Sequence, residues 1–181
     1  MKPTNEMSVM TKINLGCGQQ YREGWINCDV SPRVKADKYF DLEKFPYPLD
    51  SSIADEIVLF QVLEHLDHVP EVLDELWRIL KPGGVVNIQV PYGKSDWTLQ
   101  DPTHKHFFTE KSLDVFCLET HWYTAHKFKL LKAQLTVDST TLRHKLRNMI
   151  PFRNVLRYFL FNMYDGLTFQ IQKPTAANES K

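Results

Sequence analysis

The sequence predicts a doubly wound α/β fold, in which a mostly parallel β-sheet packs against helices. Strand-like and helix-like segments alternate along the chain, which is the pattern of such folds. The run Ile57–Phe60 is apolar without alternation, as is typical of a strand buried on both faces of a parallel sheet. The segment after it, Pro70–Gly84, has the apolar spacing of a helix and carries signals for a start and a stop.

The expected strands of the N-terminal half are short and closely spaced. Lys12–Leu15 and Trp25–Val30 are predicted as the first two strands, Lys38–Leu42 as a short third strand or extended segment, and the run 51–62 as the fourth. Only six residues, Gln19–Gly24, separate the first glycine turn from the second strand. A crossover between parallel strands normally needs a dozen or more residues, so the first crossover is expected to be shortened.

The helix after the fourth strand has the clearest boundaries. Pro70 suits a first turn, and Pro82-Gly83-Gly84 ends the helical pattern. Apolar residues recur at helical spacing, at Val72, Leu73, Leu76, Ile79 and Leu80. The remaining elements are expected to be a strand over 85–92, a short helix over Glu110–Leu118, a strand over Phe128–Val137, a basic helical region over Leu142–Tyr164, and a strand over 167–173. These elements complete a seven-stranded sheet.

The length and composition fit one globular domain. The 181 residues are 43% hydrophobic, and we expect a single domain over 11–173 with flexible tails over 1–10 and 174–181. The formal net charge is zero, which argues against a strong attraction to nucleic acid. Three cysteines without paired spacing argue against a disulfide scaffold or a zinc ribbon. Without a signal-peptide pattern or a membrane-spanning run, a cytoplasmic location is the expectation.

A glycine turn and two acids indicate a ligand site at one edge of the sheet. Gly16-Cys17-Gly18 follows the first strand, where residues without bulky side chains let the backbone approach a ligand. Asp29 ends the second strand, and a carboxylate there can accept both hydroxyls of a ribose. Asp41 and Leu42 follow the third segment, where an acid and an apolar residue could border an adenine.

These residues give the sequence a resemblance to class I S-adenosylmethionine-dependent methyltransferases. "NLGCG" resembles the first motif of that family, and "INCDV" resembles its ribose-binding strand. The most specific blocks are "ADEIVLFQVLEHL" and "LWRILKPGG", which are similar to the fourth strand and following helix of small type 11 methyltransferases, often found among glycan-building enzymes. The resemblance covers about Lys12–Phe116 and implies a Rossmann-like fold with S-adenosylmethionine as the cofactor.

The resemblance also implies roles for individual residues. Asn14 and the backbone of Gly16, Cys17 and Gly18 would hold the amino-acid half of the cofactor. Asp29 would take the ribose hydroxyls, Asp41 and Leu42 would border the adenine, and Gln61 would lie near the sulfonium. Two of these positions have a simpler explanation, since Asp41 could cap a turn and Gln61 could be a satisfied polar residue at a strand end.

Two other classes of function stay open at this point. A nicotinamide-dependent oxidoreductase is disfavoured, because the third glycine of its fingerprint is missing and a dinucleotide needs a helix N-terminus at its pyrophosphate. S-adenosylmethionine has no phosphate, so a short link after the glycine turn is compatible with it. The other alternative is a module of the same fold that binds a cofactor or partner without catalysis.

The segment "QDPTHKHFFT" supplies the candidate catalytic residues. Asp101, His104 and His106 follow the fifth strand and therefore fall at the ligand-bearing edge. Histidine titrates near neutrality and suits removal of a proton from an acceptor hydroxyl. The same segment resembles the glycan-associated methyltransferases, which favours a sugar, glycan intermediate or small metabolite as acceptor. His104 could instead only bond loop backbone. A metal site is not predicted, since loop spacing alone specifies no geometry.

The region before the last strand is basic. Eight Lys or Arg residues and one acid, Asp138, lie between His126 and Tyr158. On a helical wheel, an apolar face that includes Phe152 and Phe159 opposes Arg153 and Arg157, so the simplest expectation is a helix packed on the sheet with a solvated basic face. The alternative is contact with a membrane surface or a partner through 142–164. The oligomeric state is left open.

Overall fold

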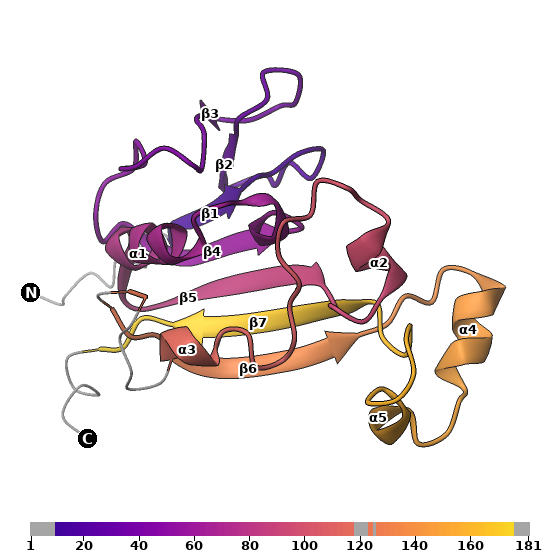
Figure 1. Ribbon diagram of the computed structural model, residues 1–181. Coiled ribbons are helices and arrows are strands. Elements are labelled where there is room, and N and C mark those ends of the chain that lie inside the picture. Colours follow the sequence, from indigo (N-terminus) through magenta and orange to yellow (C-terminus); the bar gives the residue numbers. More distant parts are fainter. Residues whose placement is uncertain (1–9, 118–122, 125, 176–181) are drawn as a thin grey trace, which may run out of the picture.

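The computed structural model describes residues 10–117, 123–124 and 126–175, so most of both expected tails lies outside the described residues. A single seven-stranded sheet organises them, in the order β3-β2-β1-β4-β5-β7-β6 (Figure 1). Its strands are β1 (Lys12–Leu15), β2 (Ile26–Asp29), β3 (Lys38–Tyr39), β4 (Ala54–Phe60), β5 (Leu80–Pro91), β6 (Lys129–Thr136) and β7 (Gly166–Gln172). Strands β1–β5 pair in parallel, and β7 is antiparallel to β5 and β6. This confirms the predicted Rossmann-like fold.

The helices that pack on the sheet lie on one face. Figure 1 shows α1 (Val69–Ile79) and α3 (Asp114–Cys117) in front of the strands. Alternate strand residues meet them in one core, which contains Ile13, Leu15, Ile57, Leu59, Val86, Ile88 and Phe169 together with Val72, Leu73, Leu76 and Ile79 of α1. The helix α1 therefore has the start and the apolar face that the sequence predicts, but it ends at Ile79, because Leu80–Gly84, expected at the end of the helix, belong to β5.

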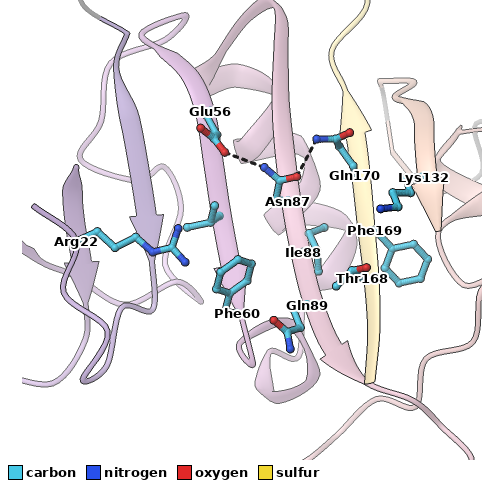
Figure 2. Close-up of a pocket in the computed structure, with 11 residues that line it drawn as sticks. Arg22, Glu56, Phe60, Asn87, Ile88, Gln89, Lys132, Thr168, Phe169 and Gln170 are labelled. Carbon is cyan, nitrogen blue, oxygen red and sulfur yellow. Dashed lines mark hydrogen bonds between the residues drawn. The ribbon is translucent and has the colours of Figure 1, made fainter. Parts of the chain in front are cut away.

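The opposite face of the sheet is largely polar. Asn87 donates its amide to Glu56 at 2.9 Å and accepts from Gln170 at 3.0 Å, so a row of side chains links β4, β5 and β7 (Figure 2). Lys12 pairs with Glu56 at 3.2 Å, and the guanidinium of Arg22 lies 4.7 Å from the centre of the Phe60 ring. The strand patterns "KINL", "VNIQV" and "LTFQIQ" alternate apolar and polar residues, and this alternation matches the one helical layer.

The shortened first crossover is confirmed, and the next two links are also without helices. The residues between β1 and β2, between β2 and β3, and between β3 and β4 form turns and irregular structure throughout. Asn27, fully buried in β2, holds the first link in place of a helix. Its side-chain amide donates to the carbonyls of Arg22 and Trp25 and to Asp37, and its oxygen accepts from the Arg22 and Asn14 nitrogens.

The C-terminal basic region differs from the expectation. Instead of one helix it contains α4 (Leu142–Asn148) and α5 (Arg153–Leu156). Phe152 and Phe159, expected to pack on the sheet, are each 81% exposed, while Arg157 is half-buried and pairs with Glu110. The helical-wheel interpretation was therefore wrong, because Arg157 pairs with Glu110 and Arg153 donates to Asn148. Contact with a membrane or partner stays a prediction.

The other helical elements are short. They are the 3-10 turn η1 (Leu63–His65) and α2 (Asp96–Leu99), neither of which the sequence analysis predicts. None of the helices in the described part of the chain is long and apolar enough to cross a membrane.

Neighbouring substitutions on β7 test the two faces of the sheet. Phe169 is 2% exposed in the helix-covered core, and Phe169→Ala should lower the free energy of unfolding by about 3–5 kcal/mol. Gln170→Ala removes one hydrogen bond on the polar face and should cost about 1 kcal/mol. Urea denaturation of both variants measures the difference. Equal losses would mean that the polar face is covered by a packed layer.

Candidate active site

The carboxyl ends of the central parallel strands bring the predicted ligand residues to one edge. Gly16 follows β1, Asp29 ends β2, and Gln61 follows β4. The loop that carries His104 follows β5. Edges of this kind are where open α/β sheets bind ligands.

The glycine turn lies against the segment after β4. Gly16 has a φ of +66°, and a Cβ added there would lie 2.5 Å from Cγ2 of Val62. Gly18 has a φ of +49° and open space where its Cβ would be. The Cys17 amide donates to the Cys28 carbonyl at 3.0 Å, which fastens the turn to β2. Gly16 is therefore needed for packing, whereas Gly18 leaves room for a ligand beside the backbone.

Asp29 connects the glycine turn to the end of β2. Its Oδ2 accepts from the Gly18 amide and its Oδ1 from the Ser31 amide, both at 2.8 Å. Each carboxylate oxygen has a second lone pair, so the side chain can still accept hydrogen bonds from a ligand. The geometry holds Asp29 beside the open space at Gly18, as a ribose-binding acid requires.

Gln61 combines backbone strain with an unpaired polar group. Its φ is +56°, in the left-handed region that non-glycine residues seldom adopt. Its amide nitrogen Nε2 is buried and has no hydrogen-bond partner among the described residues. The backbone amide donates to the Gln89 carbonyl at 2.8 Å, which holds the strained position. Strain together with a buried unpaired donor is characteristic of a ligand site.

The other predicted cofactor residues serve the protein itself. The Asn14 side-chain amide donates to the Gln20 carbonyl at 2.9 Å and to Asn27 at 3.1 Å. These bonds fasten the link between β1 and β2 to the two strands. Asp41 accepts from the Glu43 amide at 3.0 Å, so it caps a turn, as the sequence left open. Leu42 is 8% exposed and belongs to the core. Their predicted contacts with the cofactor stay predictions.

Glu64 is the functional candidate that the sequence analysis missed. It lies in η1, is fully buried, and neither carboxylate oxygen accepts a hydrogen bond within the described residues. Burial raises the pKa of the Glu64 carboxyl to about 7; nearby backbone amides oppose the rise and the charge of Asp101 adds to it. An acid inside the apolar run "VLEHL" was the sequence signal that could have identified it.

His104 and His65 lie beside Glu64 with their rings 4.8 Å apart. Nδ1 of His104 is 2.8 Å from the Thr98 carbonyl, which can only accept, so Nδ1 carries the proton. Nδ1 of His65 is 2.9 Å from the Thr103 hydroxyl, which itself donates to Asp101 at 2.7 Å. That hydroxyl must therefore accept from His65. Both imidazoles consequently keep a free lone pair on Nε2.

The three predicted catalytic residues occupy different positions. His104 belongs to the group with Glu64 and His65, whose ligand atoms lie within 4.8 Å of one another. Asp101 accepts from Thr103 and orients His65 through it, and these bonds lower the pKa of Asp101. His106 is outside the group; its ring lies near Phe108 and its backbone amide donates to the Glu64 carbonyl.

This edge, with a glycine turn after β1 and an acid ending β2 on a 3-2-1-4-5-7-6 sheet, is that of class I S-adenosylmethionine-dependent methyltransferases. A family model described as a methyltransferase domain matches residues 10–126, more than half of the chain. The chain therefore belongs to this family of enzymes, whose cofactor is S-adenosylmethionine.

Relatives agree with this assignment. A Mycolicibacterium smegmatis protein, named as a probable S-adenosylmethionine-dependent methyltransferase, is 30% identical over 96 residues. That match covers 44% of this chain and 37% of the relative. The solved structure of an Archaeoglobus fulgidus methyltransferase has a TM-score of 0.66 at 18% identity, covering 92% of this chain and 87% of that one. A Mesorhizobium loti methyltransferase has a TM-score of 0.60 at 13% identity, covering 90% of both chains.

The residues at the edge fit S-adenosylmethionine. The space beside Gly18 admits a ligand next to Asp29, and the buried amide of Gln61 is a donor without a partner in the described chain. A cofactor without phosphate also suits a turn that leads into a helix-free link.

The raised pKa of Glu64 predicts a pH-dependent stability. The folded pKa of about 7 lies above the ordinary value of 4.5, so the unfolded chain releases this proton first and stability falls as pH rises between them. Glu64→Gln should therefore be more stable than wild type at pH 8, by up to about 3 kcal/mol. A chelator is present in the measurement so that no bound cation neutralises the Glu64 carboxylate. The advantage should vanish near pH 4, where both states are protonated. Urea denaturation at both pH values tests this.

Glu71→Gln, an exposed change on α1, is the matched control. An equal effect of Glu64→Gln at both pH values would mean that the carboxylate finds a partner in solution.

Proposed function

We propose that this protein transfers a methyl group from S-adenosylmethionine to a hydroxyl oxygen of a sugar, glycan intermediate or other small metabolite. The observation that carries the proposal is the position of two imidazoles, His65 and His104, beside the buried Glu64, at the sheet edge that also holds Asp29 and Gly18. This arrangement supports a cofactor site and a basic group for the acceptor at one edge.

The residues around the glycine turn would hold the cofactor. Asp29 would accept hydrogen bonds from the ribose hydroxyls, the backbone of Gly16–Gly18 would lie along the amino-acid half, and Gln61 would donate from Nε2. When bound, S-adenosylmethionine supplies a methyl carbon already activated by its sulfonium. The protein has to align an acceptor with that carbon, and alignment alone can supply much of the acceleration.

A neutral hydroxyl acceptor must also lose its proton. His104 is the residue best suited to take it, because the Thr98 carbonyl holds its proton on Nδ1 and leaves Nε2 basic. Asp101 is then a positioning residue, which acts on His65 through Thr103. The resemblance of "DPTHKHFFT" to glycan-associated methyltransferases supports a sugar or glycan acceptor, and zero net charge argues against nucleic acid.

Removal of the Asp29 charge tests the cofactor site. Asp29→Asn should weaken S-adenosylmethionine binding about tenfold to hundredfold, because it replaces hydrogen bonds to a charged acceptor. Isothermal titration with S-adenosylmethionine, its demethylated product and NAD measures this. Asp50→Asn, an exposed change before β4, is the matched control and should leave the affinity unchanged. Binding of NAD in place of S-adenosylmethionine would contradict the proposal.

Replacement of His104 separates chemistry from cofactor binding. His104→Gln should reduce turnover of a hydroxyl acceptor by about 10²–10⁴-fold while S-adenosylmethionine affinity stays within a few-fold of wild type. Turnover is measured with a panel of sugars and nucleotide sugars. His68→Gln is the control, since His68 pairs with Glu43 outside the group. Tight cofactor binding with no methylated acceptor would favour the non-catalytic binding module.

A further inference from the structure

The group of Glu64, His65 and His104 has the ligand set of a metal site. It offers one carboxylate oxygen and two imidazole nitrogens, all within 4.8 Å of one another. Glu64 is fully buried and neither of its oxygens accepts a hydrogen bond from the residues that the structure describes, whereas His65 and His104 are partly exposed. A buried carboxylate without a hydrogen bond is costly, and it calls for a compensating charge.

The hydrogen bonds around the two imidazoles prepare them to bind an ion. Histidine ligands of metals commonly donate their other ring N–H to a carbonyl or an acid, which fixes the tautomer and the ring orientation. His104 donates from Nδ1 to the Thr98 carbonyl. His65 donates from Nδ1 to Thr103, whose hydroxyl donates to Asp101. Each imidazole thereby turns its unprotonated Nε2 away from its outer partner.

We propose that Glu64, His65 and His104 bind one divalent transition-metal ion, such as Zn²⁺ or Mn²⁺, and that the ion receives the oxygen of the acceptor. Two imidazoles and one carboxylate suit such ions, and three protein ligands leave a position open. In a tetrahedral site with bonds of about 2.0–2.1 Å, ligand atoms lie about 3.3 Å apart. The ligand atoms of the three side chains lie up to 4.8 Å apart in the structure, so they move closer together when they bind the ion.

The ion would change how the acceptor loses its proton. This inference rests on the proposed function and deepens it, because it assigns the group that receives the hydroxyl. A divalent ion lowers the pKa of a coordinated hydroxyl, so the proton can leave to water without a protein base. The acceptor oxygen then bonds to the methyl carbon as the carbon–sulfur bond breaks. In this arrangement His104 is a ligand, and the proton no longer passes to its Nε2.

Metal binding is measured directly on the full chain after removal of ions with a chelator. Isothermal titration with Zn²⁺ and with Mn²⁺ should show one ion per chain. Glu64→Gln and His104→Gln should each weaken binding on the order of a hundredfold or more, because each removes a ligand. His68→Gln is the control: it removes a surface histidine outside the group, so this variant should bind both ions as tightly as wild type does. Circular dichroism confirms that each variant is folded.

A second measurement needs no variant. Electron spin echo spectra of the wild-type protein with Mn²⁺ should show coupling to two imidazole nitrogens. The inference is overturned if neither ion binds wild type at millimolar concentration, or if both variants bind as tightly as wild type. Binding of S-adenosylmethionine without any metal affinity would leave the proposed function standing and sink this inference alone. Metal binding without S-adenosylmethionine affinity would overturn the proposed function and, with it, the role of the ion in methyl transfer, and only the metal site itself would stand.

Discussion

The burial of the Glu64 carboxylate, which has no hydrogen-bond partner in the described part of the chain, is the constraint on which the site depends. A charged group in that position is unfavourable unless it is neutralised by a proton or a cation. The main chain of the same residue organises its surroundings, since the Glu64 carbonyl accepts from the Lys105 and His106 amides. The loop after β5 is thereby held against the end of β4, which brings His104 beside Glu64 and places both near the cofactor edge.

A thin sheet supports this site. Helices cover one face only within the described residues, and the links between the first four strands contain no helix. Polar contacts take the place of helices here. Asn27 forms hydrogen bonds with the link between β1 and β2, and Asn87 joins Glu56 to Gln170 across the face without helices. Asp29 then fixes the glycine turn directly to β2. The cofactor edge is thus positioned by hydrogen bonds rather than by a packed helix.

The sequence predicted those strands and helices that short-range residue patterns determine. The strand Lys12–Leu15 was predicted to the residue and the start of α1 to within one residue, because apolar period and start signals specify them, whereas the expected stop at Pro82-Gly83-Gly84 lies inside β5. Asn27 was missed, since only tertiary contacts distinguish a buried polar hub from a surface residue, whereas the place of Glu64 in the apolar run "VLEHL" was a local signal that could have identified it. The basic region was predicted wrongly because Arg157 pairs with Glu110, which is 47 residues away in the sequence. This ion pair directs the basic side chain toward the protein rather than toward solvent. Nothing in the local sequence encodes that partner.

We expect the buried Glu64 group and the glycine turn to serve one reaction centre. A crystal structure with the demethylated cofactor and Mn²⁺, with anomalous scattering to locate the ion, tests it most directly. We expect the cofactor ribose to contact Asp29, the cofactor sulfur to face the group of Glu64, His65 and His104, and the ion to lie between these three side chains. A cofactor sulfur separated from this group by protein would contradict it.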